Sequence, residues 1–288
     1  MGQGGLALMR PAEDSRSEPP LTGQQATRIG PDNDTLSRDA FLDGAVWVWQ
    51  PRNGYRAGID AVFLAASAQP KAGQPTLKIL DAGAGVGTVG LLAAKRLEKI
   101  TDVQVTLLER SRELAALAQR NVDENKLGHC VQVAHADFLA PGAALEAVGV
   151  ARASFDLVLA NPPFHIDTHG TLPGDAIKAG ANAMGLGDLD RWARAMAHVT
   201  TPGGQVILIH KAEALAPLMA SLAPRFGALR ILPLHPREGL PASRIIITGV
   251  KGSRAPLTLL AGHILHGDGH GFTPATRMIL REGASLCL

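Results

Sequence analysis

The sequence predicts an α/β protein with a doubly wound, mostly parallel β-sheet. Strand-like apolar runs alternate with segments of helical spacing between residues 77 and 252. A glycine-rich turn joins the first of these runs to the helix that follows it, and polar side chains recur where the runs end. Such alternation is typical of βαβ units, in which a helix connects neighbouring parallel strands.

Seven apolar runs predict the strands of this sheet. They lie at residues 77–82, 104–109, 131–136, 155–160, 203–210, 229–235 and 244–252. Helical spacing predicts helices at 59–69, 88–99, 111–127, 189–200 and 212–226, the first with Asp60 as its N-cap. Too little chain separates the last two runs for a helical crossover, so we expect an antiparallel C-terminal pair of strands.

The N-terminal part of the chain differs in composition from the rest. Residues 1–40 are rich in Gly, Pro, Ser, Asp and Gln and have no apolar periodicity, which predicts a mobile tail. We expect one domain over residues 41–288, with a cap at 41–75. A strand at 45–50 within the cap would place Trp47 and Trp49 on one face, as core residues.

Bulk composition limits the class of protein. A hydrophobic content of 46% with a net charge of +2 is typical of a globular chain. Two distant cysteines, Cys130 and Cys287, fit no metal or redox spacing and favour a reducing compartment. Without an apolar run of about 18 residues or a signal-peptide pattern, we expect a cytoplasmic protein with no membrane partner.

The glycine turn "DAGAGVG" begins at Asp81, where the first strand of the sheet ends. Gly83, Gly85 and Gly87 allow a sharp turn and a close approach of ligand to backbone, and the next helix offers free N–H groups. An acid followed by G-x-G-x-G favours S-adenosylmethionine. Residues 85–90, "GVGTVG", also satisfy the dinucleotide pattern, so a nicotinamide oxidoreductase stays open.

Two further acids follow neighbouring strands. Glu109 ends the second strand, where a carboxylate can accept hydrogen bonds from both hydroxyls of a ribose. Asp137 follows the third strand and can accept from an adenine amino group. Because ligands bind at the carboxyl edge of such sheets, both acids are candidate cofactor-binding residues. The same candidate set includes Asp81, Gly83, Gly85, Gly87 and, after the fourth strand, Asn161.

The fourth strand ends in "NPPF", residues 161–164. The Asn161 side-chain oxygen and the Pro162 carbonyl can accept the two N–H groups of an exocyclic amine, which makes its nitrogen more nucleophilic. Pro162 and Pro163 fix the backbone, and Phe164 offers a face for a planar group. A sulfonium is an activated donor, so no strong base is required. The motif predicts methyl transfer to a conjugated amine.

Together these motifs resemble class I S-adenosylmethionine-dependent amino-methyltransferases with the [DNS]-P-P-[FYW] signature, over about residues 45–250. "NGYRAGIDAVFLAA" (53–66) and "HPREGLPASRIIITGVKGSRAPLTL" (235–259) are similar to the bacterial tRNA1(Val) adenine-N6 methyltransferases. The resemblance implies a Rossmann-like domain and N6-methylation of the adenine beside the anticodon, position 37. It also implies that Asp60 closes the cofactor pocket, and that RNA meets Arg237, Arg244, Lys251 and Arg254.

Charge supports an RNA partner. Residues 230–281 carry seven Arg and Lys against two acids, within a C-terminal region (230–288) of a nearly neutral chain. Three alternatives stay open. His165 makes "NPPFH" similar to rRNA guanine-N2 methyltransferases; protein-glutamine N5 methyltransferases share the signature, usually as "NPPY"; and an RNA-binding protein could keep the fold without the chemistry.

Two remaining segments bear on the site. His263, His266 and His270, with Asp268, have spacing compatible with a metal, but the mechanism needs none, and we expect a polar or RNA-contacting loop without metal. Residues 165–188 form a long Gly-rich stretch directly after the predicted catalytic motif. Long loops beside sites are often lids, so we expect this one to order on ligand binding.

Overall fold

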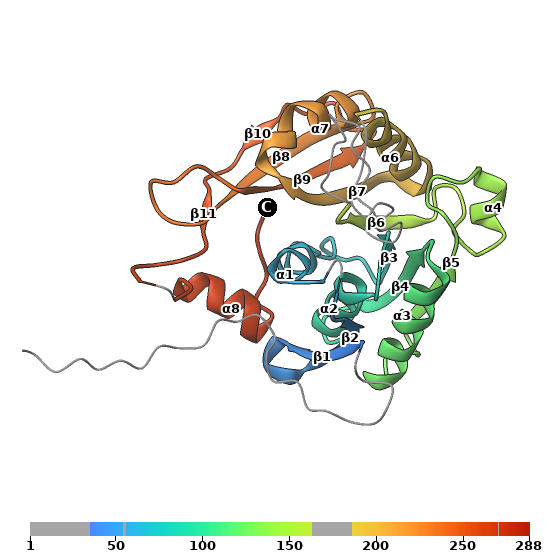
Figure 1. The fold of residues 1–288 in the computed structure, drawn as a ribbon. Helices are drawn as coiled ribbons and strands as arrows, with labels where there is room; N and C mark the ends of the chain where they lie inside the picture. Colours follow the sequence, from blue (N-terminus) through green and yellow to red (C-terminus); the bar gives the residue numbers. More distant parts are fainter. Residues whose placement is uncertain (1–34, 54–55, 163–185, 270) are drawn as a thin grey trace, which may run out of the picture.

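A computed structural model describes residues 35–53, 56–162, 186–269 and 271–288 of the chain. Its centre is one β-sheet with helices on both faces (Figure 1). No helix in these ranges is long and apolar enough to cross a membrane.

The central sheet confirms the predicted architecture. Its strands follow the order β10-β8-β9-β7-β6-β3-β4-β5, and β11 also pairs with β8. All pairs are parallel except those of β9, which runs antiparallel to β7 and β8. The strands are β3 (Thr76–Ala82), β4 (Asp102–Glu109), β5 (Val131–His135), β6 (Phe155–Ala160), β7 (Thr200–Lys211), β8 (Phe226–His235), β9 (Arg244–Lys251), β10 (Thr258–Leu259) and β11 (His263–Ile264). The seven predicted strands are therefore present, and two short strands add to the β8 edge.

Alternating residues of the strands enter two hydrophobic clusters, one on each face. Figure 1 shows α6 (Leu186–Val199) and α7 (Leu215–Leu222) above the sheet, where the short α4 (Gly142–Glu146) joins their cluster. The opposite face is covered by α1 (Ile59–Ala66), α2 (Thr88–Leu97), α3 (Arg112–Glu124) and α8 (Pro274–Glu282). A strand buried on both faces reads as a continuous apolar run, which is why these strands stand out in the sequence.

A separate two-stranded sheet lies before the central one. β1 (Leu36–Phe41) pairs antiparallel with β2 (Val46–Pro51), and the one-turn η1 (Leu42–Gly44) lies between the two strands in the chain. The predicted tail boundary at residue 40 is therefore too late, since residues 36–40 are strand; residues 1–34 lie outside the described part. The strand escaped the apolar pattern because its inward side chains, Ser37 and Asp39, are polar and buried.

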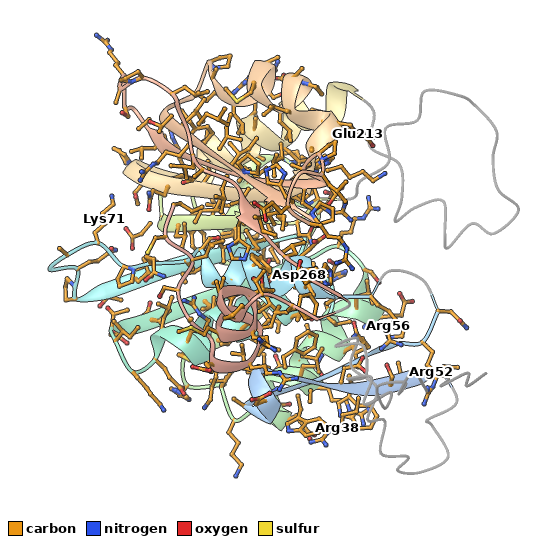
Figure 2. The ribbon with its side chains drawn as sticks, turned by 90° about the vertical axis from the view of Figure 1, so that its left-hand side faces the viewer. Arg38, Arg52, Arg56, Lys71, Glu213 and Asp268 are labelled. Atoms are coloured by element: carbon orange, nitrogen blue, oxygen red, sulfur yellow. The ribbon has the colours of Figure 1, made fainter. Side chains whose placement is uncertain are left out.

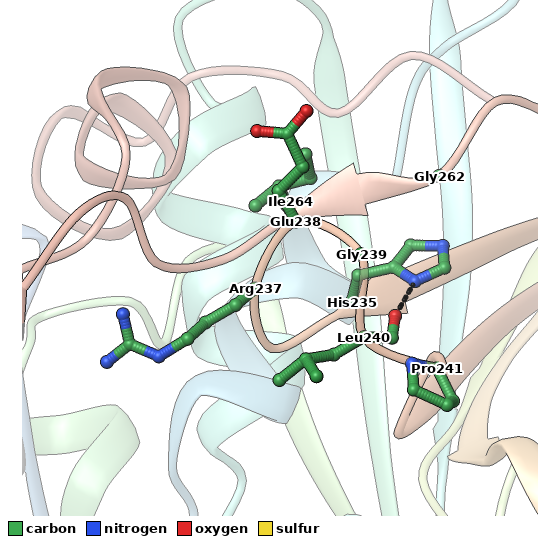
Figure 3. A pocket seen from close by; sticks show the side chains of 8 residues that line it. All are labelled: His235, Arg237, Glu238, Gly239, Leu240, Pro241, Gly262 and Ile264. Atoms are coloured by element: carbon green, nitrogen blue, oxygen red, sulfur yellow. Dashed lines mark hydrogen bonds between the residues drawn. The ribbon is translucent and has the colours of Figure 1, made fainter.

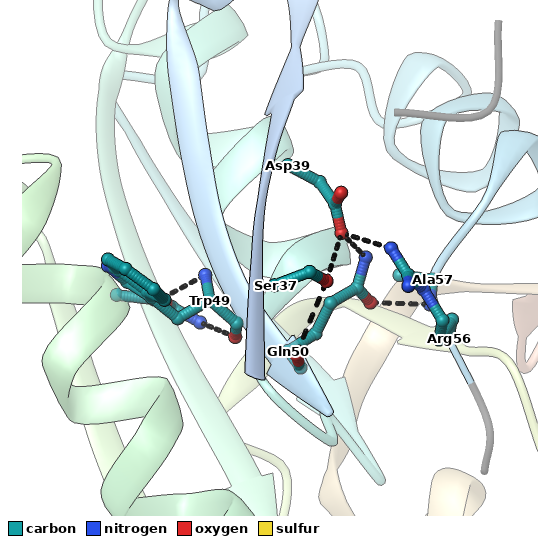
Figure 4. Close-up of polar contacts among 7 residues, drawn as sticks. Ser37, Asp39, Trp49, Gln50, Arg56 and Ala57 are labelled. Atoms are coloured by element: carbon teal, nitrogen blue, oxygen red, sulfur yellow. Dashed lines mark hydrogen bonds and ion pairs between the residues drawn. The ribbon is translucent and has the colours of Figure 1, made fainter. Parts of the chain in front are cut away.

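A buried polar network explains those inward side chains (Figure 4). Asp39 Oδ2 accepts from Ser37 Oγ at 3.1 Å, Gln50 Nε2 at 2.5 Å and Arg56 Nη2 at 2.6 Å. Gln50 Oε1 in turn accepts from the Ala57 backbone N–H at 2.9 Å. The network thus ties the chain that leads into α1 to the hairpin.

Two asparagines, Asn121 in α3 and Asn125 directly after it, hold β2 along its backbone. Asn121 and Asn125 each accept from a strand N–H and donate to the same residue's carbonyl, at Trp49 and Trp47 respectively, with distances of 2.7–3.0 Å. Asn121 Nδ2 also donates to the Val86 carbonyl in the glycine turn at 2.9 Å. We call Asn121 and Asn125 the asparagine clamp. It joins the hairpin to α3 and to the turn.

The two tryptophans share one face, as predicted. Trp49 is buried, as expected for a core residue, whereas Trp47 is half-buried, so the prediction that Trp47 is a core residue is wrong. An arginine guanidinium lies over each ring, Arg38 over Trp47 at 3.9 Å and Arg120 over Trp49 at 4.0 Å. The rings therefore pack between the strand and charged side chains of the chain itself. Figure 2 labels Arg38, which belongs to β1 of the hairpin.

Candidate active site

Polar side chains at the carboxyl edge of the sheet lie on one face. Leu77, Ile79, Leu107 and Leu159 belong to the cluster beneath α1 and α2, and every second residue of a strand shares a face. Continuing that alternation places three polar residues at the strand ends on the α1–α2 face, namely Asp81, Glu109 and Asn161. The edge therefore gathers an amide and two acids on one side of the sheet.

The three glycines of the turn have left-handed backbones, with φ of 70° at Gly83, 57° at Gly85 and 86° at Gly87. A Cβ at Gly83 would lie 3.0 Å from Trp192, and one at Gly87 would lie 2.7 Å from Leu107. Packing and φ thus both require glycine at these two positions. A Cβ at Gly85 would meet no heavy atom within 4 Å, so this residue borders open space.

Glu109 is buried beneath that open position. Its Oε2 accepts from the Gly85 N–H at 2.8 Å, and its Oε1 accepts from the Ser111 N–H at 2.7 Å. A carboxylate offers about four lone-pair sites, so two acceptor sites remain for a ligand. Glu109 therefore both shapes the turn and offers a bidentate acceptor to hydroxyl groups.

Asp81 supports the turn from below. It is 1% exposed, and its Oδ2 accepts from the Gly90 N–H of α2 at 2.8 Å. Burial raises the pKa of Asp81 from 3.8 to about 7; the Gly90 N–H opposes this rise, and the charge of Glu109 adds to it. With almost no exposed surface, Asp81 positions the start of α2 rather than facing the open space beside Gly85.

Asp137 remains at the surface after β5. Its Oδ1 accepts from the Leu139 N–H at 2.9 Å, a short local turn, and the carboxylate stays exposed. The next residue, Phe138, is buried edge-on against Trp192 with ring centroids 5.1 Å apart. Since Trp192 also packs under Gly83, this side chain of α6 joins the two loops. Sequence analysis missed Trp192, and the rarity of tryptophan in the chain was the signal that could have found it.

Asp60 and Arg244 form an ion pair at the same edge. Arg244 Nε donates to Asp60 Oδ2 at 2.9 Å, with both side chains mostly buried. Arg244 starts β9 and pairs in register with Lys211 at the end of β7. The predicted N-cap role of Asp60 is wrong, because Gly58 precedes the helix and no side chain caps it. Asp60 instead lies in the first turn of α1 and faces β9.

The four basic residues expected to face RNA are not together. Arg237 follows β8 at the edge that holds Arg244, and its Nη1 donates to the Gly267 carbonyl at 2.9 Å. Lys251 ends β9 and donates to the Thr200 carbonyl at the start of β7, and Arg254 lies beyond it. An antiparallel strand carries its two ends to opposite edges, so Arg244 and Lys251 are about 23 Å apart along β9. Only Arg237 and Arg244 lie at the edge of Asn161.

The predicted catalytic motif is described in part. Asn161 is half-buried and Pro162 is buried directly after β6. Pro163, Phe164 and His165 lie outside the described residues, as does the predicted lid up to residue 185. Its last residues, 186–188, belong to α6.

The histidines near the C-terminus have partners of their own. His263 Nε2 lies 2.9 Å from Thr276 Oγ1, and its ring meets Phe63 edge-on. The His266 ring stacks on Phe272 with centroids 4.6 Å apart. Within the described ranges, no three histidine, cysteine or acidic residues gather as a metal site, and His270 lies outside those ranges.

Comparison with known proteins identifies the family. The methyltransferase small domain model matches residues 61–184. A crystal structure described as a predicted O-methyltransferase from Agrobacterium tumefaciens is 32% identical, with a TM-score of 0.65, and the match covers 80% of this chain and 99% of that one. The chain belongs to the S-adenosylmethionine-dependent methyltransferases. S-Adenosylmethionine is accordingly its cofactor.

Curated relatives of this methyltransferase are named tRNA1(Val) (adenine(37)-N6)-methyltransferase. One from Escherichia coli is 31% identical over 128 residues, 44% of this chain and 48% of that protein. One from Bacteroides thetaiotaomicron is 30% identical over 121 residues, 42% of this chain and 46% of that protein. The chain thus matches about half the length of these relatives. A type I restriction-modification methyltransferase subunit from Streptococcus thermophilus shares the fold at 15% identity and a TM-score of 0.56.

The site fits the cofactor. We call the open space beside Gly85 the cradle, since no heavy atom lies within 4 Å of a Cβ added there, and Glu109 beneath it would offer acceptor sites to the two ribose hydroxyls. Bound there, the cofactor supplies a methyl group activated by its sulfonium. The methyltransferase itself would provide the turn, the ribose acceptor and the start of α2.

Replacement of Gly85 by alanine is expected to weaken cofactor binding at least about tenfold, because the added Cβ enters the cradle. The left-handed backbone adds strain of about 1 kcal/mol to the folded state. Calorimetric titration with S-adenosylmethionine measures the affinity. Gly149→Ala is the matched control, since its φ is 84° and no atom lies within 4 Å of its added Cβ. Equal affinity in both variants would contradict the cradle.

Replacement of Asp81 by asparagine is expected to stabilise the cofactor-free protein at pH 8. Between about pH 4 and pH 7 the folded state holds a proton that the unfolded state has released, so the wild-type free energy of unfolding falls as pH rises through this window. Asparagine keeps an acceptor for the Gly90 N–H and removes the titration. Urea denaturation from pH 5 to pH 8 tests this. The exposed Asp123→Asn should retain the wild-type slope, and parallel curves for Asp81→Asn and wild type would contradict the assignment.

Proposed function

We propose that this methyltransferase transfers a methyl group to N6 of an adenine in tRNA, with the adenine at position 37 of tRNA1(Val) as the first candidate. The observation that carries the proposal is the position of Asn161 and Pro162. Both follow β6 at the edge that holds Glu109 and the cradle beside Gly85, and Asn161 lies on the same face of the sheet as Glu109. The names of the curated relatives supply the substrate.

Asn161 and Pro162 would act on the acceptor amine. The Asn161 side-chain oxygen and the Pro162 carbonyl accept its two N–H groups and hold the nitrogen lone pair toward the methyl group. The nitrogen–carbon bond forms as the carbon–sulfur bond breaks, which leaves S-adenosylhomocysteine. The surplus proton on nitrogen then passes to water. Buried Pro162 keeps its carbonyl fixed during this exchange.

Basic side chains at the same edge would meet the RNA backbone. Arg237 and Arg244 lie on one side of the site. Arg52 and Arg56 are exposed after the N-terminal hairpin, near its end (Figure 2). A base in an anticodon loop is already partly unpaired. Moving it out of its stack toward Asn161 therefore costs only about a few kcal/mol. A tRNA substrate also places the protein in the cytoplasm.

The experiment is tritiated methyl transfer from S-adenosylmethionine to total tRNA, rRNA and protein from cells that lack the gene, followed by nucleoside mass spectrometry. N6-Methyladenosine in one tRNA would support the proposal. N2-Methylguanosine in rRNA would replace it with guanine methylation. A labelled methyl group on an oxygen would replace the proposal with O-methylation, as in the description of the Agrobacterium relative. Label only in protein would exclude RNA as the substrate.

A further inference from the structure

A shallow cavity of about 580 Å³, widely open to solvent, lies at the carboxyl end of β8, beside the proposed catalytic edge (Figure 3). Its lining comes from the β8–β9 loop and from the chain around β11, and it includes His235, Arg237, Leu240, Pro241, Gly262 and Ile264. Its volume is in the range of small-molecule pockets. The proposed reaction at Asn161 does not use this cavity.

The walls of the cavity suit a flat, partly polar group. The His235 ring packs so closely on Gly262 that an added Cβ would lie 2.3 Å from two ring atoms. His235 Nδ1 lies 2.8 Å from the Leu240 carbonyl, which can only accept, so Nδ1 carries a proton in this contact. Leu240 is 49% exposed. The cavity thus combines a fixed planar ring with an uncovered apolar side chain.

A fixed cation adds to this arrangement. Arg237 donates through Nη1 to the Gly267 carbonyl, which anchors its guanidinium. Glu238, which also lines the cavity, is exposed. Acidic and basic side chains are therefore balanced, and the lining favours an uncharged heterocycle over a bare phosphate.

The cavity lies about one nucleotide away from the place proposed for the methylated base. β7 and β9 lie between β6, which ends before Asn161, and β8, which ends at His235. Three inter-strand steps give about 14 Å between the two strand ends. Arg244, paired with Asp60 of α1, starts β9 in this interval, where a backbone phosphate would pass. A neighbouring nucleotide of the same RNA strand can span this distance.

We propose that this cavity binds the base of a nucleotide flanking the methylated adenine. The inference rests on the proposed tRNA substrate and adds a second recognition site to it. Stacking on His235 and Leu240 would hold the flanking base, while Arg244 contacts the phosphate between the two nucleotides. The enzyme would thereby read sequence context as well as the target base.

The test uses full-length tRNA1(Val), or the tRNA that the labelling experiment identifies, with a single abasic nucleotide at each position flanking the target. We expect one abasic position to lower kcat/KM of the wild-type enzyme about tenfold. Leu240→Ser should remove most of this penalty, because the base then has less to stack on. Leu257→Ser is the matched control; Leu257 is 47% exposed and lies beyond Arg254, at the other edge, and its variant should retain the penalty.

A second pair of variants protects the test against misfolding. Arg237→Ala should raise KM for tRNA and leave the affinity for S-adenosylmethionine unchanged, whereas Arg152→Ala, at an exposed residue before β6 and therefore at the opposite edge, should change neither. An abasic penalty that is the same in wild type and Leu240→Ser, or absent at every flanking position, would overturn the subsite. Failure of the proposed function is distinct, since wild-type enzyme would then transfer no methyl group to unmodified tRNA.

Discussion

Replacement of Asn161 by alanine is expected to lower the rate of methyl transfer about 100- to 1000-fold, the loss typical of removing one preorganised polar group from a catalytic site. The affinity for S-adenosylmethionine should change little, because the cradle at Gly85 and the carboxylate of Glu109 are untouched. Single-turnover kinetics with tRNA, together with calorimetric titration of the cofactor, measures both quantities.

Conservative variants sharpen this prediction. Asn161→Asp and Asn161→Ser keep an acceptor oxygen near the amine, so both should retain more activity than Asn161→Ala. A wild-type rate for Asn161→Ala would remove Asn161 from the mechanism. Equal losses in all three variants would show that the amide matters for a reason other than its oxygen.

Replacement of Glu109 by glutamine is expected to weaken S-adenosylmethionine binding about 10- to 100-fold. Hydrogen bonds to a charged group contribute about 1.5–3 kcal/mol, and glutamine removes the charge as well as one of the two acceptor oxygens. The Gly85 and Ser111 N–H groups donate to different oxygens of this carboxylate, so one of them would also lose its acceptor. Calorimetry again measures the affinity.

Glu113→Gln is the control for this effect. Glu113 lies in the first turn of α3, only four residues from Glu109, but it is exposed and accepts from the Ser111 hydroxyl. Its variant should bind the cofactor as wild type does. If both variants bind equally well, the loss of charge near the turn has no effect and Glu109 is not the ribose acceptor.

The sheet was predictable because its strands are buried on both faces. Continuous apolar runs such as "LKILDA" report that burial directly, and the glycines of the turn report left-handed backbone. β1 was not predictable by the same reasoning, since its buried positions carry Ser37 and Asp39. Only the partners Gln50 and Arg56 make those positions tolerable in the interior, and no local pattern reveals such partners.

The sequence of the C-terminal region contains helix-capping residues that the analysis of its charge did not use. The hydroxyl of Thr273, the residue before α8, caps the start of the helix, and the left-handed Gly283 follows its last residue. Both signals are present in the sequence. The direction of β9 also separates Lys251 and Arg254 from Arg244, a consequence of the antiparallel pairing that the sequence predicts. The Asp60–Arg244 pair joins residues 184 apart, and only tertiary structure reveals it.

The asparagine clamp has a consequence for solubility. One edge of β2 pairs with β1. At the other edge, the side-chain amides of Asn121 and Asn125 make the hydrogen bonds that the peptide groups of a third strand would make. An uncovered strand edge is a template for pairing with another chain. Asn121 and Asn125 therefore close a two-stranded ribbon that would otherwise be open to self-association. Without both amides, the outer edge of β2 would be free to pair with a strand of another chain. We expect aggregation rather than simple unfolding to limit the yield of such a variant.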